Sequence, residues 1–149
     1  HKAFIVPHSR ILLDSYQHWT GRELLARRED DEATARALFE APFAVLSGGP
    51  QEDQILNYGN LTTLGLWEMD WDTLVRTPSR YTAEPMHRDE RAEFLRQVRE
   101  NGYIDNYQGI RISSTGKRFR IEQATVWNLI NQRGEFVGQA ATFKSVTRL

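Results

Sequence analysis

Two amide side chains, Asn128 and Gln139, are the residues of this chain best suited to bind a polar group in an apolar setting. They lie in two segments that alternate like β-strands, on either side of a turn signal at Arg133-Gly134. Pairing the segments about this turn sets Asn128 opposite Gln139. Because an unpaired buried amide costs about 1–3 kcal/mol, both need partners. Two interpretations are open: the amides bond each other or nearby backbone, or they bind a small organic ligand.

The same pairing predicts which other residues meet across the hairpin. On the face of the amides, Ile130 lies opposite Val137, Val126 opposite Ala141, and Ala124 opposite Phe143. On the other face Trp127 lies opposite Ala140 and beside Gly138, small residues that leave room for an indole ring. Both faces of the sheet are therefore expected to be apolar, and both must be covered.

A second hairpin is predicted just before the first, around residues 113–117. An even-length turn, of two or four residues, sets Ile112 opposite Phe119 and Ile110 opposite Ile121, whereas a three-residue turn would mix the faces. The even-length turn is therefore favoured. In this register Tyr107 and Arg111 share the face of the amides and are further candidates for ligand binding.

The residue types needed for most enzymes and metal sites are not brought together by their spacing. His1, His8, His18 and His87 are scattered and are expected at the surface, so no metal site is predicted. Acidic pairs are adjacent in sequence, where their side chains diverge, and no serine lies in a nucleophile elbow. We expect no catalytic residues and no enzyme, and the sequence indicates no particular cofactor.

Length and charge limit the remaining classes. The 149 residues fit one domain, and a net charge of -1 with a pI near 6.5 argues against a nucleic-acid-binding protein. The sequence contains no cysteine, which fits a reducing compartment and hence a cytoplasmic location. No apolar run is long enough to cross a membrane, so no membrane contact is expected.

The elements that would position the amides begin with an N-terminal helix. Ser9 can cap a helix from about residue 10 into residues 24–25, with Gly21 weakening its middle. Leu12, Tyr16 and Trp19 form an apolar stripe on this helix. The second apolar face of the sheet must be covered by this helix, by a partner subunit, or by both. With Trp127, these three residues are the candidates for a dimer interface.

The middle of the chain predicts two strands and several short helices. The strands are residues 43–47 and 54–58, and the caps are Thr34, Asn60 and Asp70. A longer helix opens at Asp89 and stops at Gly102, where glycine suits a left-handed C-terminal position. A three-stranded antiparallel meander then occupies residues 102–146.

Several collinear segments resemble the MEKHLA domain family, a family with a PAS-like fold. The resemblance runs from about residue 34 to residue 143 and rests on these segments: APFAVLS (41–47), ILNYGN (55–60), LWEMDW (66–71), PSRYTAEP (78–85), GYIDNYQGIRIS (102–113) and VWNLI (126–130).

The resemblance implies an α+β fold, a five-stranded antiparallel sheet with short helices on one face, joined here by the N-terminal helix. Residues 1–33 are then an N-terminal helical extension and residues 34–149 the PAS-like domain. PAS relatives sense small molecules, light or redox state, and they associate with other proteins. Light-sensing relatives need a cysteine for a flavin adduct, and haem-binding ones use a histidine on the long helix. This sequence has no cysteine, and residues 91–101 hold no histidine.

The expected function is a stand-alone sensory or interaction domain that binds a small organic ligand between sheet and helices and acts through protein association. Its partners would be that ligand, a second copy of the chain, or another protein. Two alternatives are a structural dimerisation module without a ligand, and an enzyme that acts on a small molecule in the same cavity.

Overall fold

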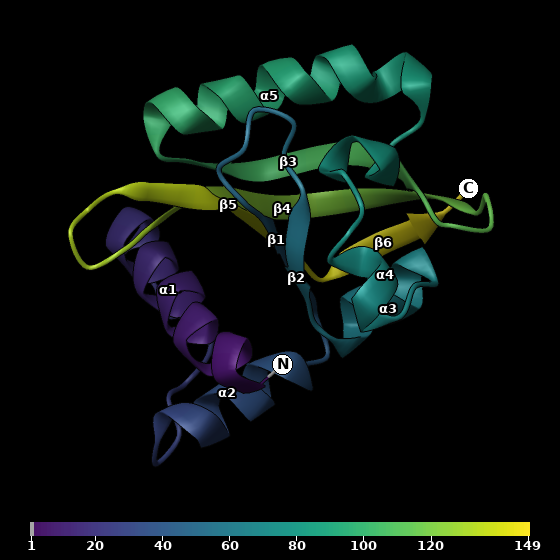
Figure 1. Ribbon diagram of the computed structural model, residues 1–149. Coiled ribbons are helices and arrows are strands. Elements are labelled where there is room, and N and C mark those ends of the chain that lie inside the picture. The colour runs from purple at the N-terminus through teal and green to yellow at the C-terminus, as the bar shows by residue number, and fades with distance from the viewer. Residues whose placement is uncertain (1) are drawn as a thin grey trace.

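The computed structural model describes residues 2–149 and shows an antiparallel sheet covered by helices on both faces (Figure 1). The elements in chain order are α1 (Lys2–Thr20), α2 (Asp31–Phe39), β1 (Ala44–Gly48), β2 (Leu56–Gly59), α3 (Leu61–Trp67), α4 (Trp71–Leu74), the 3₁₀ turns η1 (Ser79–Thr82) and η2 (Pro85–His87), α5 (Arg88–Asn101), β3 (Tyr103–Ile112), β4 (Arg118–Ile130), β5 (Phe136–Phe143) and β6 (Ser145–Arg148). The α+β fold is as predicted.

The sheet has the strand order β2-β1-β5-β4-β3, with β6 pairing with β4 as a sixth strand. The five expected strands are therefore present, and the chain's last residues extend the sheet. The β4–β5 pairing puts Asn128 opposite Gln139, Val126 opposite Ala141 and Trp127 opposite Ala140, as predicted. The expected pairing of Ile130 with Val137 is wrong, because an irregularity in β5 puts Phe136 opposite Ile130.

The turn between β3 and β4 is the main error of the predicted register. Ile112 pairs with Arg118 and Arg111 with Phe119, so the even-length turn is wrong. The turn has three central residues, with Gly116 at a φ of 88° and its N–H donated to the carbonyl of Ser113. Only a glycine adopts this left-handed conformation without strain, which makes the three-residue turn favourable.

The N-terminal helix α1 is longer at its start and shorter at its end than expected. It begins at Lys2 and ends at Thr20, so Ser9 lies within the helix instead of capping it. Gly21, at a φ of 72°, ends the helix. The start is earlier because His8, like Leu12, faces the core and is buried, so the buried stripe continues toward the N-terminus.

The caps of the middle helices were predicted with one exception. Asn60 and Asp70 accept hydrogen bonds from the N–H groups of Thr63 and Thr73, as expected. Helix α2 is capped by Asp30, not Thr34, because the side chain of Asp30 accepts from the N–H of Ala33. Thr34 instead accepts from the N–H of Arg28 and holds the preceding loop.

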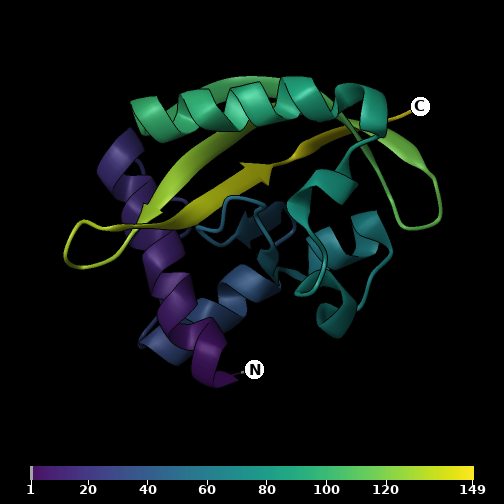
Figure 2. The ribbon, with the colours of Figure 1, turned by 45° about the horizontal axis from the view of Figure 1, so that its top comes forward.

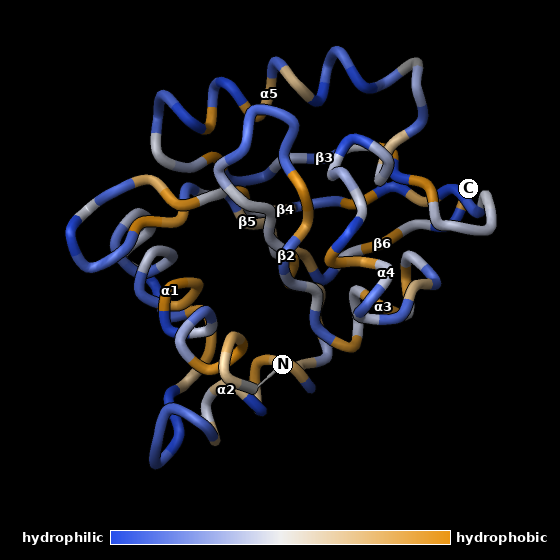
Figure 3. Tube along the Cα trace, in the orientation of Figure 1, coloured by the Kyte–Doolittle hydropathy of each residue, from blue (hydrophilic) through white to orange (hydrophobic). Residues whose placement is uncertain are grey.

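Each face of the sheet has its own hydrophobic cluster. Helices α1 and α2 cover one face, where Trp127 meets the ring of Tyr16 edge-on at a centroid distance of 5.0 Å. Trp67 of α3 packs on the other face against Phe119 and Phe143, and α5 lies along the same face (Figure 2). The hydropathy of α5 follows this division, because its hydrophobic residues lie on the parts of its turns nearest to the sheet and its outermost parts are hydrophilic (Figure 3). The N-terminal helix thus covers the second apolar face.

His8 is buried against the sheet, so its predicted surface position is wrong. Its Nε2 lies 2.8 Å from Oγ of Ser47, and Ser47 donates a hydrogen bond of 2.6 Å to Oδ1 of Asn57. Ser47 therefore accepts from a neutral imidazole, whose ring also stacks on Phe4. Burial lowers the pKa of His8 from 6.5 to about 4.

We expect His8 to make the protein less stable in mild acid. Its pKa is lower in the folded state, so the unfolded state binds a proton first as the pH falls below 6.5. The free energy of unfolding should fall by about 2 kcal/mol from this group between pH 7 and pH 5. His8→Phe should remove that part of the pH dependence in urea denaturation, whereas the same change at exposed His18 should leave it intact. Equal pH dependence in His8→Phe and the wild type would contradict the assignment.

We expect Gly102 to set how closely α1 approaches the start of β3. A Cβ atom at this position would lie 2.5 Å from the ring of Trp19, and its φ is 96°. Gly102→Ala should therefore lower the free energy of unfolding by about 2–3 kcal/mol, from backbone strain and displacement of the indole. The control is Gly116→Ala, which has a similar φ but no atom within 4 Å, and should cost about 1 kcal/mol. Equal losses in the two variants would show that the indole contact contributes nothing.

Candidate functional site

The amide pair is present and holds α5 to the sheet. Nε2 of Gln139 donates to Oδ1 of Asn128 at 3.3 Å and to the carbonyl of Leu95 at 2.9 Å. Nδ2 of Asn128 donates to the carbonyl of Arg99 at 3.1 Å, and Gln54 donates to Oε1 of Gln139 at 3.4 Å. The amides thus bond each other and the backbone of α5, which is the first of the two sequence interpretations. Their role in ligand binding stays a prediction.

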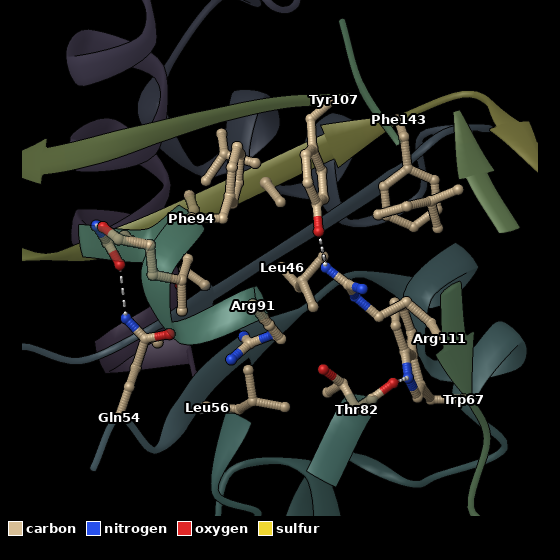
Figure 4. Close-up of a pocket in the computed structure, with 18 residues that line it drawn as sticks. Leu46, Gln54, Leu56, Trp67, Thr82, Arg91, Phe94, Tyr107, Arg111 and Phe143 are labelled. Carbon is tan, nitrogen blue, oxygen red and sulfur yellow. Dashed lines mark hydrogen bonds between the residues drawn. The ribbon is translucent and has the colours of Figure 1, made fainter. Parts of the chain in front are cut away.

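A cavity of about 50 Å³ lies between the sheet and the helices, and Figure 4 shows the side chains that line it. Gln139 reaches it and Asn128 does not line it. Its walls are mostly apolar, and the side chains that form them come from strands and helices far apart in sequence: Leu46, Leu56, Trp67, Phe94, Leu95, Ile121, Val126, Ala141 and Phe143. Its charged lining residues are Arg91 and Arg111.

Tyr107 and Arg111 both line the cavity from β3. Nη2 of Arg111 donates to the hydroxyl of Tyr107 at 3.2 Å, and Nη1 donates to the carbonyl of Ile110 at 2.8 Å. Gly109 lies between them, and a Cβ there would be 2.7 Å from the Tyr107 hydroxyl. The glycine therefore leaves space for the tyrosine and arginine to meet above the strand. Phe94 of α5 stacks on Tyr107 with a centroid distance of 3.8 Å.

Two irregularities in the sheet decide that Arg111 faces the cavity. The three-residue turn puts Arg111 opposite Phe119. A bulge at Gln123, with a φ of 53°, then adds one residue to β4, so that Phe119 and Ala124 lie on the same face of the sheet. The predicted register contained neither feature. Because each reverses the alternation of side chains, the two errors cancel, and Arg111 still lies on the face of Gln139.

Arg91 is the cavity residue that the sequence analysis missed. It lies on α5 one turn before Phe94 and Leu95, at the helical spacing of that apolar stripe, and this spacing was an available signal. No carboxylate among the described residues forms an ion pair with Arg91 or Arg111. Burial and the neighbouring charge of Arg111 lower the pKa of Arg91 to about 9, which leaves the guanidinium charged at neutral pH.

The four candidates for a dimer interface lie together within one chain. Leu12, Tyr16 and Trp127 are buried, and Nε1 of Trp19 donates to the carbonyl of Asn128 at 2.9 Å. These side chains are therefore covered by the chain's own fold. A role for them in a dimer stays a prediction, as does the division of the chain at residue 34.

Residues 2–149 offer neither a metal site nor a membrane span. No three histidine, aspartate or glutamate side chains there converge in a way that could hold a metal ion. Within the same residues no helix combines the length and the apolar character that a membrane span requires.

Solved structures with this arrangement of strands and helices are PAS and light-oxygen-voltage domains. The PAS domain of a protein from Colwellia psychrerythraea gives a TM-score of 0.65 at 14% identity, over 79% of this chain and 95% of that chain. A light-oxygen-voltage domain described with a flavin analogue gives 0.61 at 17% identity, over 78% and 84%. The light-state dimer of the fungal blue-light photoreceptor Vivid gives 0.60 at 12% identity, over 87% and 88%. The chain therefore has the PAS fold.

The family is shown by the sequence itself. The model of the MEKHLA domain matches residues 6–148, nearly the whole chain, and the chain belongs to this family. The match begins within α1, earlier than the resemblance seen in the sequence alone. No curated protein matches the chain.

We expect Gln139 to stabilise the docking of α5. Gln139→Ala removes hydrogen bonds to Leu95 and Asn128 and should lower the free energy of unfolding by about 1–3 kcal/mol. Amide hydrogen exchange of residues 95–101 should become faster. The matched control is Gln97→Ala on the exposed side of α5, which should change neither quantity by a measurable amount. Unchanged exchange in Gln139→Ala would show that the amide does not hold the helix.

Proposed function

We propose that this protein is a sensory domain that binds a small organic ligand in the cavity between the sheet and α5. Membership in a family with the PAS fold supports a role in sensing or interaction. The observation that supports ligand binding is the cavity itself. It has apolar walls and two arginine side chains that form no ion pair with a carboxylate among the described residues. A core that served stability alone would gain by closing this space and leaving out the charges.

The output of such a domain would be a change in protein association. The ligand would touch α5 through Phe94 and Leu95, and α5 is held to the sheet by a few side-chain hydrogen bonds around Gln139. A ligand that shifts α5 would alter the exposed side of this helix, where Arg96 pairs with Glu93 and Glu100. We place this association in the cytoplasm, with a second copy of the chain or another protein as the partner.

The location of the cavity also bears on the two alternatives. Dimerisation without a ligand is favoured by the bonded amide pair, which leaves Asn128 satisfied within the chain. An enzyme needs a titratable group poised for proton transfer in the cavity. The described lining offers arginines and a tyrosine hydroxyl already bonded to Arg111, which suit binding better than acid–base catalysis.

The proposal is tested by filling the cavity. Ala141 lies on β5 in the cavity wall, and Ala141→Val adds two carbon atoms on a strand that tolerates β-branched residues. Native mass spectrometry of freshly purified wild-type protein should show a bound organic molecule, and Ala141→Val should lose it while its melting temperature stays the same or rises.

Ala3→Val is the control, because Ala3 lies on the exposed side of α1 and the variant adds the same atoms far from the cavity lining. Analytical ultracentrifugation of the loaded and the stripped wild type should then differ. Absence of a bound molecule, together with no stabilisation by any acid or amide of a small-molecule panel, would overturn ligand binding. A ligand that Ala141→Val retains would place it elsewhere.

A further inference from the structure

Two positive charges line one small cavity from opposite layers of the fold. Arg111 comes from the sheet and is 8% exposed, and Arg91 comes from α5 and is partly buried. Both side chains line the same cavity, and burial together with the charge of Arg111 lowers the pKa of Arg91. Like charges are costly in an apolar setting unless an anion joins them. Among the described residues, the protein supplies no such anion.

The two arginines differ in how many of their N–H groups already donate hydrogen bonds within the protein. Arg111 donates to the Tyr107 hydroxyl and to the carbonyl of Ile110. No described residue accepts a hydrogen bond from the Arg91 guanidinium, so its fork of N–H groups can donate to a bidentate acceptor. A carboxylate suits that geometry, because its two oxygens match two parallel N–H groups.

The volume and walls of the cavity restrict what the carboxylate can be attached to. The cavity measures about 50 Å³, whereas sites for drug-sized ligands measure roughly 300–1,000 Å³. A single buried water needs roughly 10–15 Å³, so the space holds only a few non-hydrogen atoms. Leu46, Ile121, Val126 and Phe143 offer those atoms apolar contacts. The fitting molecule has one carboxylate and a short apolar chain.

The entrance to the cavity carries positive charge as well. A surface groove shares Gln54, Arg91, Leu95 and Gln139 with the cavity. Its further lining holds more arginines than carboxylates: Arg80, Arg88, Arg96 and Arg99 against Glu52, Asp53 and Asp89. Of these, Arg99 lies over the ring of Phe136, another residue of the groove, at 3.7 Å from its centroid. An anion approaching along this groove would meet favourable potential before it reaches Arg91.

We infer that the ligand of this domain is a short-chain monocarboxylate whose carboxylate is bound by Arg91 and Arg111. This inference rests on the proposed function, since it assigns a chemical class to the ligand of the same cavity. Arg91 is the specific anchor, because no described residue accepts from its donors, while Arg111 also holds Tyr107 in place.

The test uses acetate, propionate and butyrate as probes, with propionamide as a neutral match and inorganic phosphate as an anion without an apolar part. Isothermal titration and thermal denaturation of the wild type should show binding of the carboxylates. Propionamide and phosphate should bind at least about tenfold more weakly. Arg91→Met should weaken propionate binding at least about tenfold and raise the melting temperature of the ligand-free protein, because it removes an unpaired charge.

Two further variants distinguish a specific loss of propionate binding from a general loss of structure. Arg91→Lys keeps the charge but not the fork, so it should bind propionate with intermediate affinity. Arg36→Met, on the exposed side of α2 and outside both the cavity and the groove, should bind like the wild type. Carboxylate binding that Arg91→Met leaves unchanged would overturn the inference.

The panel also separates failure of this inference from failure of the proposed function. Equal binding of propionamide and propionate would refute the carboxylate while keeping a ligand in the cavity. Phosphate bound as tightly as propionate would refute the role of the apolar walls. No binding of any probe, with no molecule bound in the purified protein, would remove both the inference and the function on which it rests.

Discussion

Asn128 uses each of its polar groups to connect the two sides of the sheet. Its N–H donates to the carbonyl of Gly102 and its carbonyl accepts from the indole of Trp19 on α1. Its side chain donates to the carbonyl of Arg99 and accepts from Gln139. A buried amide is costly to leave unpaired, so these contacts must form together. The position of α1 on one face and of α5 on the other is thereby fixed relative to a single residue of β4.

That constraint explains why one end of α5 is bonded to the sheet while a cavity lies farther along it. The amide pair bonds the carbonyls of Leu95 and Arg99 in the C-terminal half of α5, and Phe94 and Arg91 lie over the cavity just before them. A helix fixed at one end can respond to what lies under the rest of it. The apolar walls and the two guanidinium groups then decide which molecules bind. An apolar body suits the walls, and a single negative charge suits the guanidinium groups.

The predicted turn between β3 and β4 shows how far the sequence could lead toward this site. Apolar alternation favoured an even-length turn, because it put Ile112 with Phe119. The left-handed conformations of Gly116 and Gln123 override that pattern, and a bulge at a non-glycine residue has no clear signature in sequence. Arg111 was placed on the correct face only because the two omissions cancel. Arg91 was missed because an arginine on a mainly polar helix is usually solvated, and only the packing of α5 over β3 makes it a cavity residue.

The sequence by itself determined the order of the elements, the α+β fold, most of the helix caps and the pairing of Asn128 with Gln139. These features follow from local preferences and from the alternation of side chains along two neighbouring strands. Tertiary structure decided the burial of His8, the contact of both amides with α5, and the meeting of Arg91 with Arg111 in one cavity. Each of these depends on how two distant elements are placed in space. Such placement is set by the packing of whole faces against one another. No single segment of the sequence contains the information that determines this packing.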